Sequence, residues 1–207
     1  MKITAETKLF IGIFISILAI FGVAFFLSSL PEPTVSKDEL IPKATLSATG
    51  SATATTYLVE FSDFQCPACR AFSPIVDRIV KTNQDKIYFV YRHFPLLQHP
   101  FGKKAAQAAI AASKQGKFWE MHDFLFDNQD GLSDDLLNDA IQILGLGKEQ
   151  FTKDFESNET QELISQDMLD GGRFGVNATP TFFLNGKKLN LAGPEELKSL
   201  VENEITK

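Results

Sequence analysis

Hydrophobic and polar positions form several distinct patterns along the 207-residue chain, and the first is an uninterrupted apolar stretch. Leu9–Leu30 covers 22 positions without a charged residue. A membrane-spanning helix needs about 20 apolar residues, so this stretch predicts one N-terminal transmembrane anchor after a short cytoplasmic segment at residues 1–8. A cleaved signal peptide, cut near Gly22-Val23-Ala24, is the alternative, but cleavage there would leave Phe25-Phe26-Leu27 at the new terminus, which favours the anchor.

Residues 31–55 have a different composition, rich in Pro, Ser, Thr, Ala and Gly. Segments of this composition have little capacity to pack, and we expect a flexible tether here. The remaining residues, 56–207, have the length of one domain.

Two β-branched and aromatic runs open this domain, and both predict buried strands. They are Thr56–Phe61 and Lys86–Phe94. The residues between them, from Pro67 to about Lys81, have the pattern of a helix in which Pro74 introduces a kink. A strand, a helix and a strand at this spacing predict a βαβ unit with two parallel strands.

From Phe101 to about Phe174 the apolar positions change to helical spacing. Three helices are predicted at Lys103–Ser113, Lys117–Asn128 and Leu136–Leu144, the last of them capped by Ser133. A fourth is expected to begin with Asn158 as its cap.

Strand patterns return at the C-terminal end of the domain. Thr181–Leu184 and Lys187–Leu191 flank Asn185-Gly186, the dipeptide preferred in type I′ hairpin turns. Pro194 suits the first position of a terminal helix. The predicted order is therefore βαβ, a helical block, and ββα.

Composition and charge narrow the classes of function. The chain has a net charge of −6, and no stripe of Lys and Arg follows its predicted elements, so nucleic-acid binding is disfavoured. Its 19 phenylalanines provide ample apolar surface for a core.

The chain has only two cysteines, in the motif Cys66-Pro67-Ala68-Cys69 between the first strand and the helix that follows. Pro67 suits the first helical position, which predicts Cys66 as the N-cap residue. The unpaired N–H groups and the positive end of a helix stabilise a thiolate, which is the reactive form of cysteine. Cys69, one turn inward, is expected to keep its proton longer and to resolve mixed disulfides. The motif therefore indicates a redox site.

Other interpretations of the cysteine pair have less support. A c-type haem site requires His directly after the second cysteine, where this chain has Arg70. A zinc site would need more ligands, and His93 and His99 follow the motif at a longer spacing than in zinc fingers. A pair of unreactive buried thiols remains an alternative, which Pro67 disfavours. The three histidines, including His122, are expected to be structural.

The order of elements and several segments resemble the DsbA-like thiol:disulfide oxidoreductases of bacterial envelopes. The similarity runs from about Tyr57 to the C-terminus. Its segments are Val59–Cys69, Arg92–Leu96, Gly116–Asp123 and Gly175–Thr181. The resemblance implies an α/β thioredoxin fold with an inserted helical domain at about residues 101–174, preceded here by the predicted transmembrane helix.

The resemblance also implies a substrate-binding surface around the cysteines. Thr179–Pro180 would form a cis peptide bond beside the disulfide and dock extended substrate chains, next to Pro67 and Ala68 in the motif. Many membrane-anchored relatives carry a second cysteine pair in the helical insertion, and this chain has none. Ala68 stands where strongly oxidising members have His, so a weaker oxidant is expected.

Glu60 is an acidic residue in an otherwise apolar strand. The resemblance implies that it is a buried acid whose raised pKa lets it exchange a proton with Cys69. A solvent-facing position at the end of the strand is the alternative.

The expected function is that of a thiol:disulfide oxidoreductase at the cell membrane, with its catalytic domain in the periplasm or on the outer face. It would exchange the Cys66–Cys69 disulfide with cysteines of envelope or secreted proteins, acting as an oxidant. It would need no metal or organic cofactor, and the resemblance implies a quinone-linked membrane oxidase that reoxidises it. The alternatives are a reductase or isomerase of the same fold, and a non-catalytic module that binds peptides or a metal.

Overall fold

The computed structural model describes residues 5–28, 34–43 and 45–207, and it divides the chain into two units, Met1–Pro33 and Thr34–Lys207. The first unit contains the helix α1 (Ala5–Ser28). Among the residues described, we find no helix that combines the length and the apolar character needed to cross a membrane. The expected anchor Leu9–Leu30 ends outside the described residues, at positions 29 and 30.

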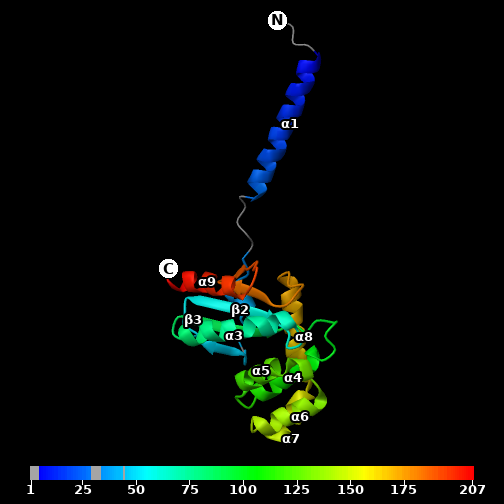
Figure 1. Cartoon of the computed structure of the whole chain (residues 1–207), viewed down its shortest axis with the longest axis vertical. Coiled ribbons are helices and arrows are strands. Elements are labelled where there is room, and N and C mark those ends of the chain that lie inside the picture. The colour runs from blue at the N-terminus through cyan, green and yellow to red at the C-terminus, as the bar shows by residue number, and fades with distance from the viewer. Residues whose placement is uncertain (1–4, 29–33, 44) are drawn as a thin grey trace. The chain divides into compact units, whose positions relative to one another are not determined.

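The second unit is built on a sheet that has, among the described residues, five strands in the order β1-β3-β2-β4-β5 (Figure 1). Their bounds are β1 Ala48–Gly50, β2 Thr56–Ser62, β3 Ile87–His93, β4 Thr181–Leu184 and β5 Lys187–Lys188. The parallel pairing of β2 with β3 confirms the predicted βαβ unit. Asn185 and Gly186 have φ angles of 49° and 86°, which confirms the type I′ turn.

One face of the sheet is covered by two helices, α3 (Pro67–Thr82) and α9 (Pro194–Ile205). Side chains from both helices share one apolar cluster with the strands, in which Ile79 and Leu197 pack with Leu58 and Phe89. Because side chains alternate along a strand, Glu60 lies on the same face as Leu58, under α3. Strand alternation therefore brings the one acidic residue of β2 to the helix that carries Cys69.

The helical insertion forms a block beside the sheet (Figure 1). Its elements are α4 Gly102–Ser113, α5 Phe118–Asp127, the 3-10 turn η1 Gln129–Gly131, α6 Asp134–Ile143, α7 Lys148–Phe155 and α8 Asn158–Arg173. The cap of α6 is Ser133, as predicted, and it accepts a hydrogen bond from the N–H of Leu136. The cap of α8 is Ser157 rather than Asn158, because the Ser157 hydroxyl accepts the N–H of Thr160.

The structure differs from the expected tether over residues 34–55. This segment contains a short helix, α2 (Lys37–Leu40), and the edge strand β1, which pairs with β3. Leu40 is 0% exposed in the core on the second face of the sheet. The buried guanidinium of Arg92 also donates hydrogen bonds to the carbonyl oxygens of Glu39 and Leu40. These contacts fix a segment whose composition alone indicates a linker.

Candidate active site

Cys66 is the N-cap residue of α3, and Pro67 occupies the first helical position, which confirms the sequence prediction. The Cys66 sulfur lies 3.3 Å from the carbonyl oxygen of Thr179, to which the thiol donates a hydrogen bond when it is protonated. The Thr179–Pro180 peptide bond is cis, as expected. Pro67 and Ala68 are exposed next to the largely buried Cys66. The structure thus brings the cysteine motif and the loop before β4 together at one site.

The surroundings of Cys66 favour its thiolate. A hydrogen bond from the Cys69 thiol is the main cause that lowers the pKa of Cys66, to about 5. Thr179 and the backbone N–H groups of Cys69 and Ala68 lower this pKa further, and burial opposes them. At neutral pH the Cys66 sulfur is therefore a thiolate, the species that attacks disulfides.

Cys69 has the opposite electrostatic character. It is 0% exposed, and burial raises its pKa far above the usual range of a thiol. The neighbouring Cys66 and the charge of Glu60 raise this pKa further. At neutral pH Cys69 therefore keeps its own proton, and it needs a base before its sulfur can react.

Glu60 is that candidate base. It is 2% exposed on β2, where it pairs with Tyr91 of β3 and Phe182 of β4. Burial raises the pKa of Glu60 to about 8, the Ser62 hydroxyl lowers it, and the charge of Cys66 raises it. A carboxyl group with this pKa can hold or release a proton at physiological pH. The structure thus excludes the alternative of a solvent-facing strand end.

Gln129, a residue that the sequence analysis did not single out, holds the segment before α3 in place. Its buried side-chain amide donates to the carbonyl oxygens of Phe64 and Cys66, over 2.8 and 3.0 Å. Gln129 belongs to η1 in the insertion, so the helical block positions the nucleophile directly. Its partners lie more than 60 positions away, and no local pattern in the sequence marks it.

Asp63 is a second buried anchor of the same segment. Its carboxylate accepts hydrogen bonds from the N–H groups of Gln65 and Leu96, each over 2.8 Å, and lies 2.7 Å from Nδ1 of His99. A Cβ at Gly102 would come within 2.7 Å of the Asp63 carboxylate, so a larger residue there would displace this carboxylate from its hydrogen bonds. Asp63 lies within a segment that carries the family resemblance, and this was the only signal of its role.

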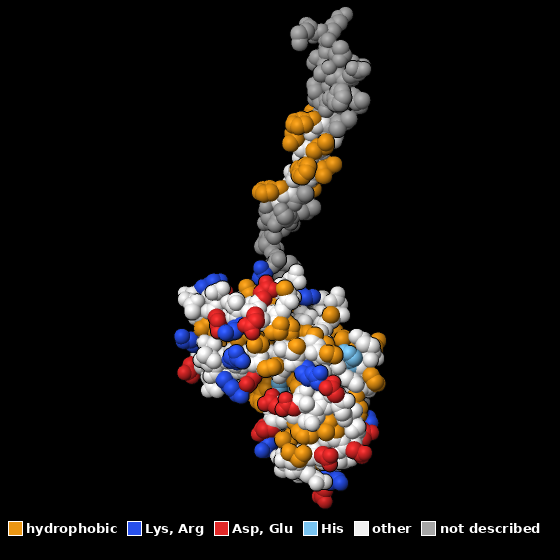
Figure 2. Space-filling model, viewed as in Figure 1, with side chains coloured by type: hydrophobic (Ala, Val, Ile, Leu, Met, Phe, Trp, Pro, Cys, Tyr) orange, Lys and Arg blue, Asp and Glu red, His pale blue; other side chains and the backbone are white. Residues whose placement is uncertain are grey.

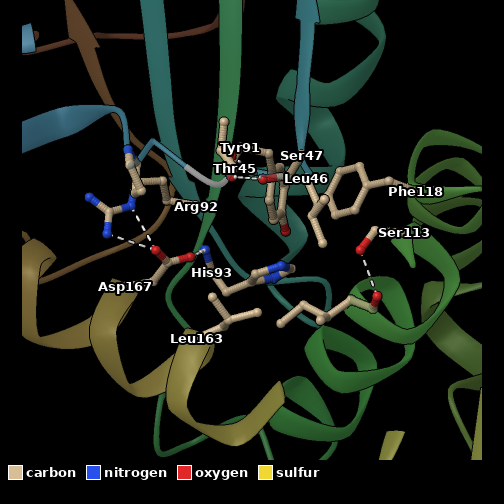
Figure 3. Close-up of a pocket in the computed structure, with 12 residues that line it drawn as sticks. Thr45, Leu46, Ser47, Tyr91, Arg92, His93, Ser113, Phe118, Leu163 and Asp167 are labelled. Atoms are coloured by element: carbon tan, nitrogen blue, oxygen red, sulfur yellow. Dashed lines mark hydrogen bonds and ion pairs between the residues drawn. The ribbon is translucent and has the colours of Figure 1, made fainter. Parts of the chain in front are cut away.

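The described part of the chain contains no cluster of side chains that resembles a metal site. Within it, no group of three or more His, Cys, Asp and Glu residues could hold a metal ion. His93 lines a small cavity of about 50 Å³ together with Tyr91, Phe118 and the ion pair of Arg92 with Asp167 (Figure 3). Neither cysteine lines this cavity.

The protein surface shows no concentration of positive charge on the face seen in Figure 2, where basic and acidic side chains are interspersed. This distribution agrees with the absence of a basic stripe in the sequence.

Comparison with known proteins relates this site to a family. A family model described as thioredoxin matches residues 43–203. A thioredoxin-like oxidoreductase from Silicibacter pomeroyi is 27% identical, with a TM-score of 0.70 over 84% of this chain and 99% of that one. Pseudomonas aeruginosa DsbA2 is 26% identical, with a TM-score of 0.64 over 79% and 95% of the two chains. The chain belongs to the DsbA-like thiol:disulfide oxidoreductases of the thioredoxin family.

The curated relatives of this DsbA-like chain are longer proteins. Na(+)/H(+) antiporter NhaA 1 of Mycolicibacterium gilvum is 39% identical over 148 residues, which is 70% of this chain and 24% of the antiporter. The chain therefore spans about a quarter of the length of this relative.

Proposed function

We propose that this DsbA-like protein exchanges its Cys66–Cys69 disulfide with cysteines of envelope or secreted proteins, as an oxidant. The observation that carries the proposal is the contrast within the motif. The pKa of Cys66 is lowered to about 5, whereas that of buried Cys69 is raised far above its usual range. An oxidant gains its driving force from the stability of its reduced form, and a stable Cys66 thiolate supplies it.

In the oxidising direction, a substrate thiolate attacks the Cys66 sulfur of the disulfide. A mixed disulfide forms, the Cys66–Cys69 bond breaks, and its electron pair leaves on Cys69, which takes a proton from Glu60. The second substrate thiolate then attacks the substrate sulfur of the mixed disulfide. The substrate disulfide forms, and Cys66 leaves as the stabilised thiolate. Each turnover oxidises two substrate thiols and reduces one enzyme disulfide.

Four positions frame Cys66 and are proposed to bind the substrate: Pro67 and Ala68 are exposed, Pro180 is partly exposed, and Thr179 is buried. Pro67 and Ala68 flank the sulfur on the motif, and Thr179 and Pro180 face it from the loop before β4. Extended peptides bind exposed backbone edges through main-chain hydrogen bonds, which suits a loop that leads directly into a strand.

Trapping of the mixed disulfide tests the reaction. Cys69→Ala removes the resolving thiol, so the Cys66 thiolate of the variant should attack substrates that carry a disulfide and accumulate the resulting mixed disulfides, with the second substrate sulfur released as a thiolate. The matched variant Cys66→Ala should trap none, since Cys69 is buried. Reduced, unfolded ribonuclease with each protein provides a direct assay of disulfide formation. Binding of this substrate without any change in its thiol content would indicate a non-catalytic module, and faster reduction than oxidation would indicate a reductase.

We further propose that Leu9–Leu30 tethers the domain to the cell membrane, with the domain outside the cytoplasm. The 22 uncharged residues support a tether, and an oxidising compartment suits a disulfide-exchanging pair. Such a tether would keep the domain near a quinone-linked membrane oxidase that reoxidises it. Full-length chain should be recovered in membranes, with its domain cut by protease added from the outer face. A soluble form that begins near Phe25 would show a cleaved signal peptide instead.

A further inference from the structure

The proposed exchange reaction moves a proton between a buried sulfur and solvent. Cys69 is 0% exposed and Glu60 is 2% exposed, so neither reaches bulk water directly. Each proton that Cys69 gives to Glu60 has to leave before the next turnover, and each proton that Glu60 gives has to be replaced. The reaction therefore requires a path from Glu60 to the surface.

One cavity provides such a path. It has a volume of about 220 Å³, with Glu60 and His122 among its buried lining and Asp77, Lys81 and Asp123 toward the surface. The side chains of these last three residues are 46%, 67% and 59% exposed. Since a water molecule occupies roughly 30 Å³ in the liquid, a cavity of this size has room for several waters. Glu60, His122 and Asp77 supply polar partners for them within a lining whose surface is otherwise largely apolar.

His122 reaches the cavity from α5, in the helical insertion. Its Nδ1 lies 2.8 Å from a carboxylate oxygen of Asp123. Because a carboxylate accepts hydrogen bonds, we assign the hydrogen of the neutral imidazole to Nδ1, which leaves the lone pair on Nε2. The rings of Phe64, Tyr91 and Trp119 pack around the imidazole and fix its orientation.

We propose that His122, oriented by Asp123, relays protons between Glu60 and solvent through this cavity. The inference rests on the proposed thiol–disulfide exchange and deepens it, because it gives the helical insertion a role in proton transfer. His122 acts through Glu60, whereas the sulfur chemistry belongs to the cysteines.

The relay acts when Cys69 resolves a mixed disulfide and the enzyme disulfide forms again. The S–H bond of Cys69 breaks and its proton passes to Glu60. The Cys69 sulfur then bonds to Cys66, and the electron pair of the broken mixed disulfide leaves on the substrate sulfur. Glu60 passes the proton to cavity water, and Nε2 of His122 delivers it to bulk solvent. Reduction of the enzyme runs the same proton route in reverse.

The other ionisable groups of the cavity lie at its outer end, and two further ones, Tyr91 and His93, lie in the adjoining aromatic cluster. Asp77 and Lys81 of α3 form an ion pair over 2.9 Å at the outer end. Burial holds the pKa of Tyr91 on β3 well above its usual range and lowers that of His93 on β3 to about 3. Neither side chain therefore exchanges protons at neutral pH.

The two buried histidines provide a matched test in the full-length protein. His122→Ala and His93→Ala each remove an imidazole from the same aromatic cluster, but only His122 lines the Glu60 cavity. The rate of enzyme reduction by a dithiol peptide is measured by rapid quench and thiol alkylation, from mildly acidic to alkaline pH. His122→Ala should be about tenfold slower at neutral pH with an unchanged reduction potential, and added imidazole should restore its rate. His93→Ala should keep the wild-type pH profile and show no response to imidazole.

Asp123→Asn provides a second test that leaves the packing of the ring intact, with exposed Asp127→Asn on the same helix as its control. Asp123→Asn should slow exchange and shift its pH profile, and Asp127→Asn should do neither. The relay would be overturned if His122→Ala reacted as fast as His93→Ala, and Asp123→Asn as fast as Asp127→Asn, without rescue by imidazole. Exchange by the wild type in the same experiment would still uphold the proposed function. A wild type without exchange would overturn both.

Discussion

The thiol of Cys66 and the carbonyl oxygen of Thr179 lie 3.3 Å apart, although 113 positions separate the two residues in the sequence. The contact joins the first turn of α3 to the loop before β4. It places the reactive sulfur beside the loop that we propose binds the substrate. The same neighbourhood, above all the Cys69 thiol, sets the acidity of Cys66.

The pH dependence of alkylation tests this account of Cys66. Its pKa is lowered to about 5, so iodoacetamide should modify the reduced protein at a rate that rises through pH 5 and levels off above it. Cys69→Ala removes the main hydrogen bond to the thiolate and should move this midpoint upward. Cys66→Ala should block modification at neutral pH. Preferential labelling of Cys69 in the wild type would contradict the assigned roles.

Glu60 should reduce the stability of the fold at neutral and alkaline pH. Its pKa is raised from 4.5 to about 8, so the cost of ionising it is absent below pH 4.5, grows between these values and is complete above pH 8. Glu60→Gln should therefore stabilise the reduced protein at pH 7 by about 3 kcal/mol, and hardly at all at pH 4.5. Urea unfolding at the two pH values measures the difference. Glu120→Gln, at an exposed site, should show no such dependence, and a pH-independent effect of Glu60→Gln would disprove the pKa argument.

Local patterns in the sequence account for the βαβ unit, most helices of the insertion and the position of Cys66. They fail where a partner far along the chain decides the structure. β1 (Ala48–Gly50) is short and composed of small residues, and it is a strand only because β3 pairs with it. α7 (Lys148–Phe155) contains only two large apolar residues, Phe151 and Phe155, and its other positions are polar or charged.

The candidate site divides in the same way. The cysteines follow from spacing and helix-start rules, and Glu60 and Thr179–Pro180 follow from the family resemblance. Gln129 could not be predicted as a site residue, because no sequence pattern shows that a polar side chain in a short turn is buried. The sequence predicts a structural role for His122, and the proton-relay role that we propose rests on the cavity that it shares with Glu60.

The buried ion pairs of Arg92 are expected to stabilise the fold. The Arg92 side chain is 1% exposed and forms ion pairs with Asp167 and Asp170, over 2.7 and 2.8 Å. Arg92→Met removes the buried cation from two largely buried carboxylates and should cost roughly 3–5 kcal/mol of stability in urea unfolding. Lys104→Met breaks an exposed ion pair and should cost less than about 1 kcal/mol. Equal losses in the two variants would show that the Arg92 pairs do not hold the fold.

Ala68 is the position at which we expect a substitution to change the oxidising power of the couple. Its side chain is exposed next to Cys66 and supplies neither charge nor a hydrogen-bond donor, so the thiolate depends on Cys69, Thr179 and backbone N–H groups. Ala68→His adds a donor and partial positive charge at the helix end, which should lower the pKa of Cys66 below about 5 and make the reduction potential less negative. Equilibration with glutathione measures the potential, and about 30 mV corresponds to 1.4 kcal/mol for this two-electron couple. Ala68→Gln, a polar control without a positive charge, should change the potential less. If Ala68→His leaves both pKa and potential unchanged, the N–H groups and the Cys69 thiol already saturate the stabilisation of the thiolate, and residue 68 does not set the oxidising power.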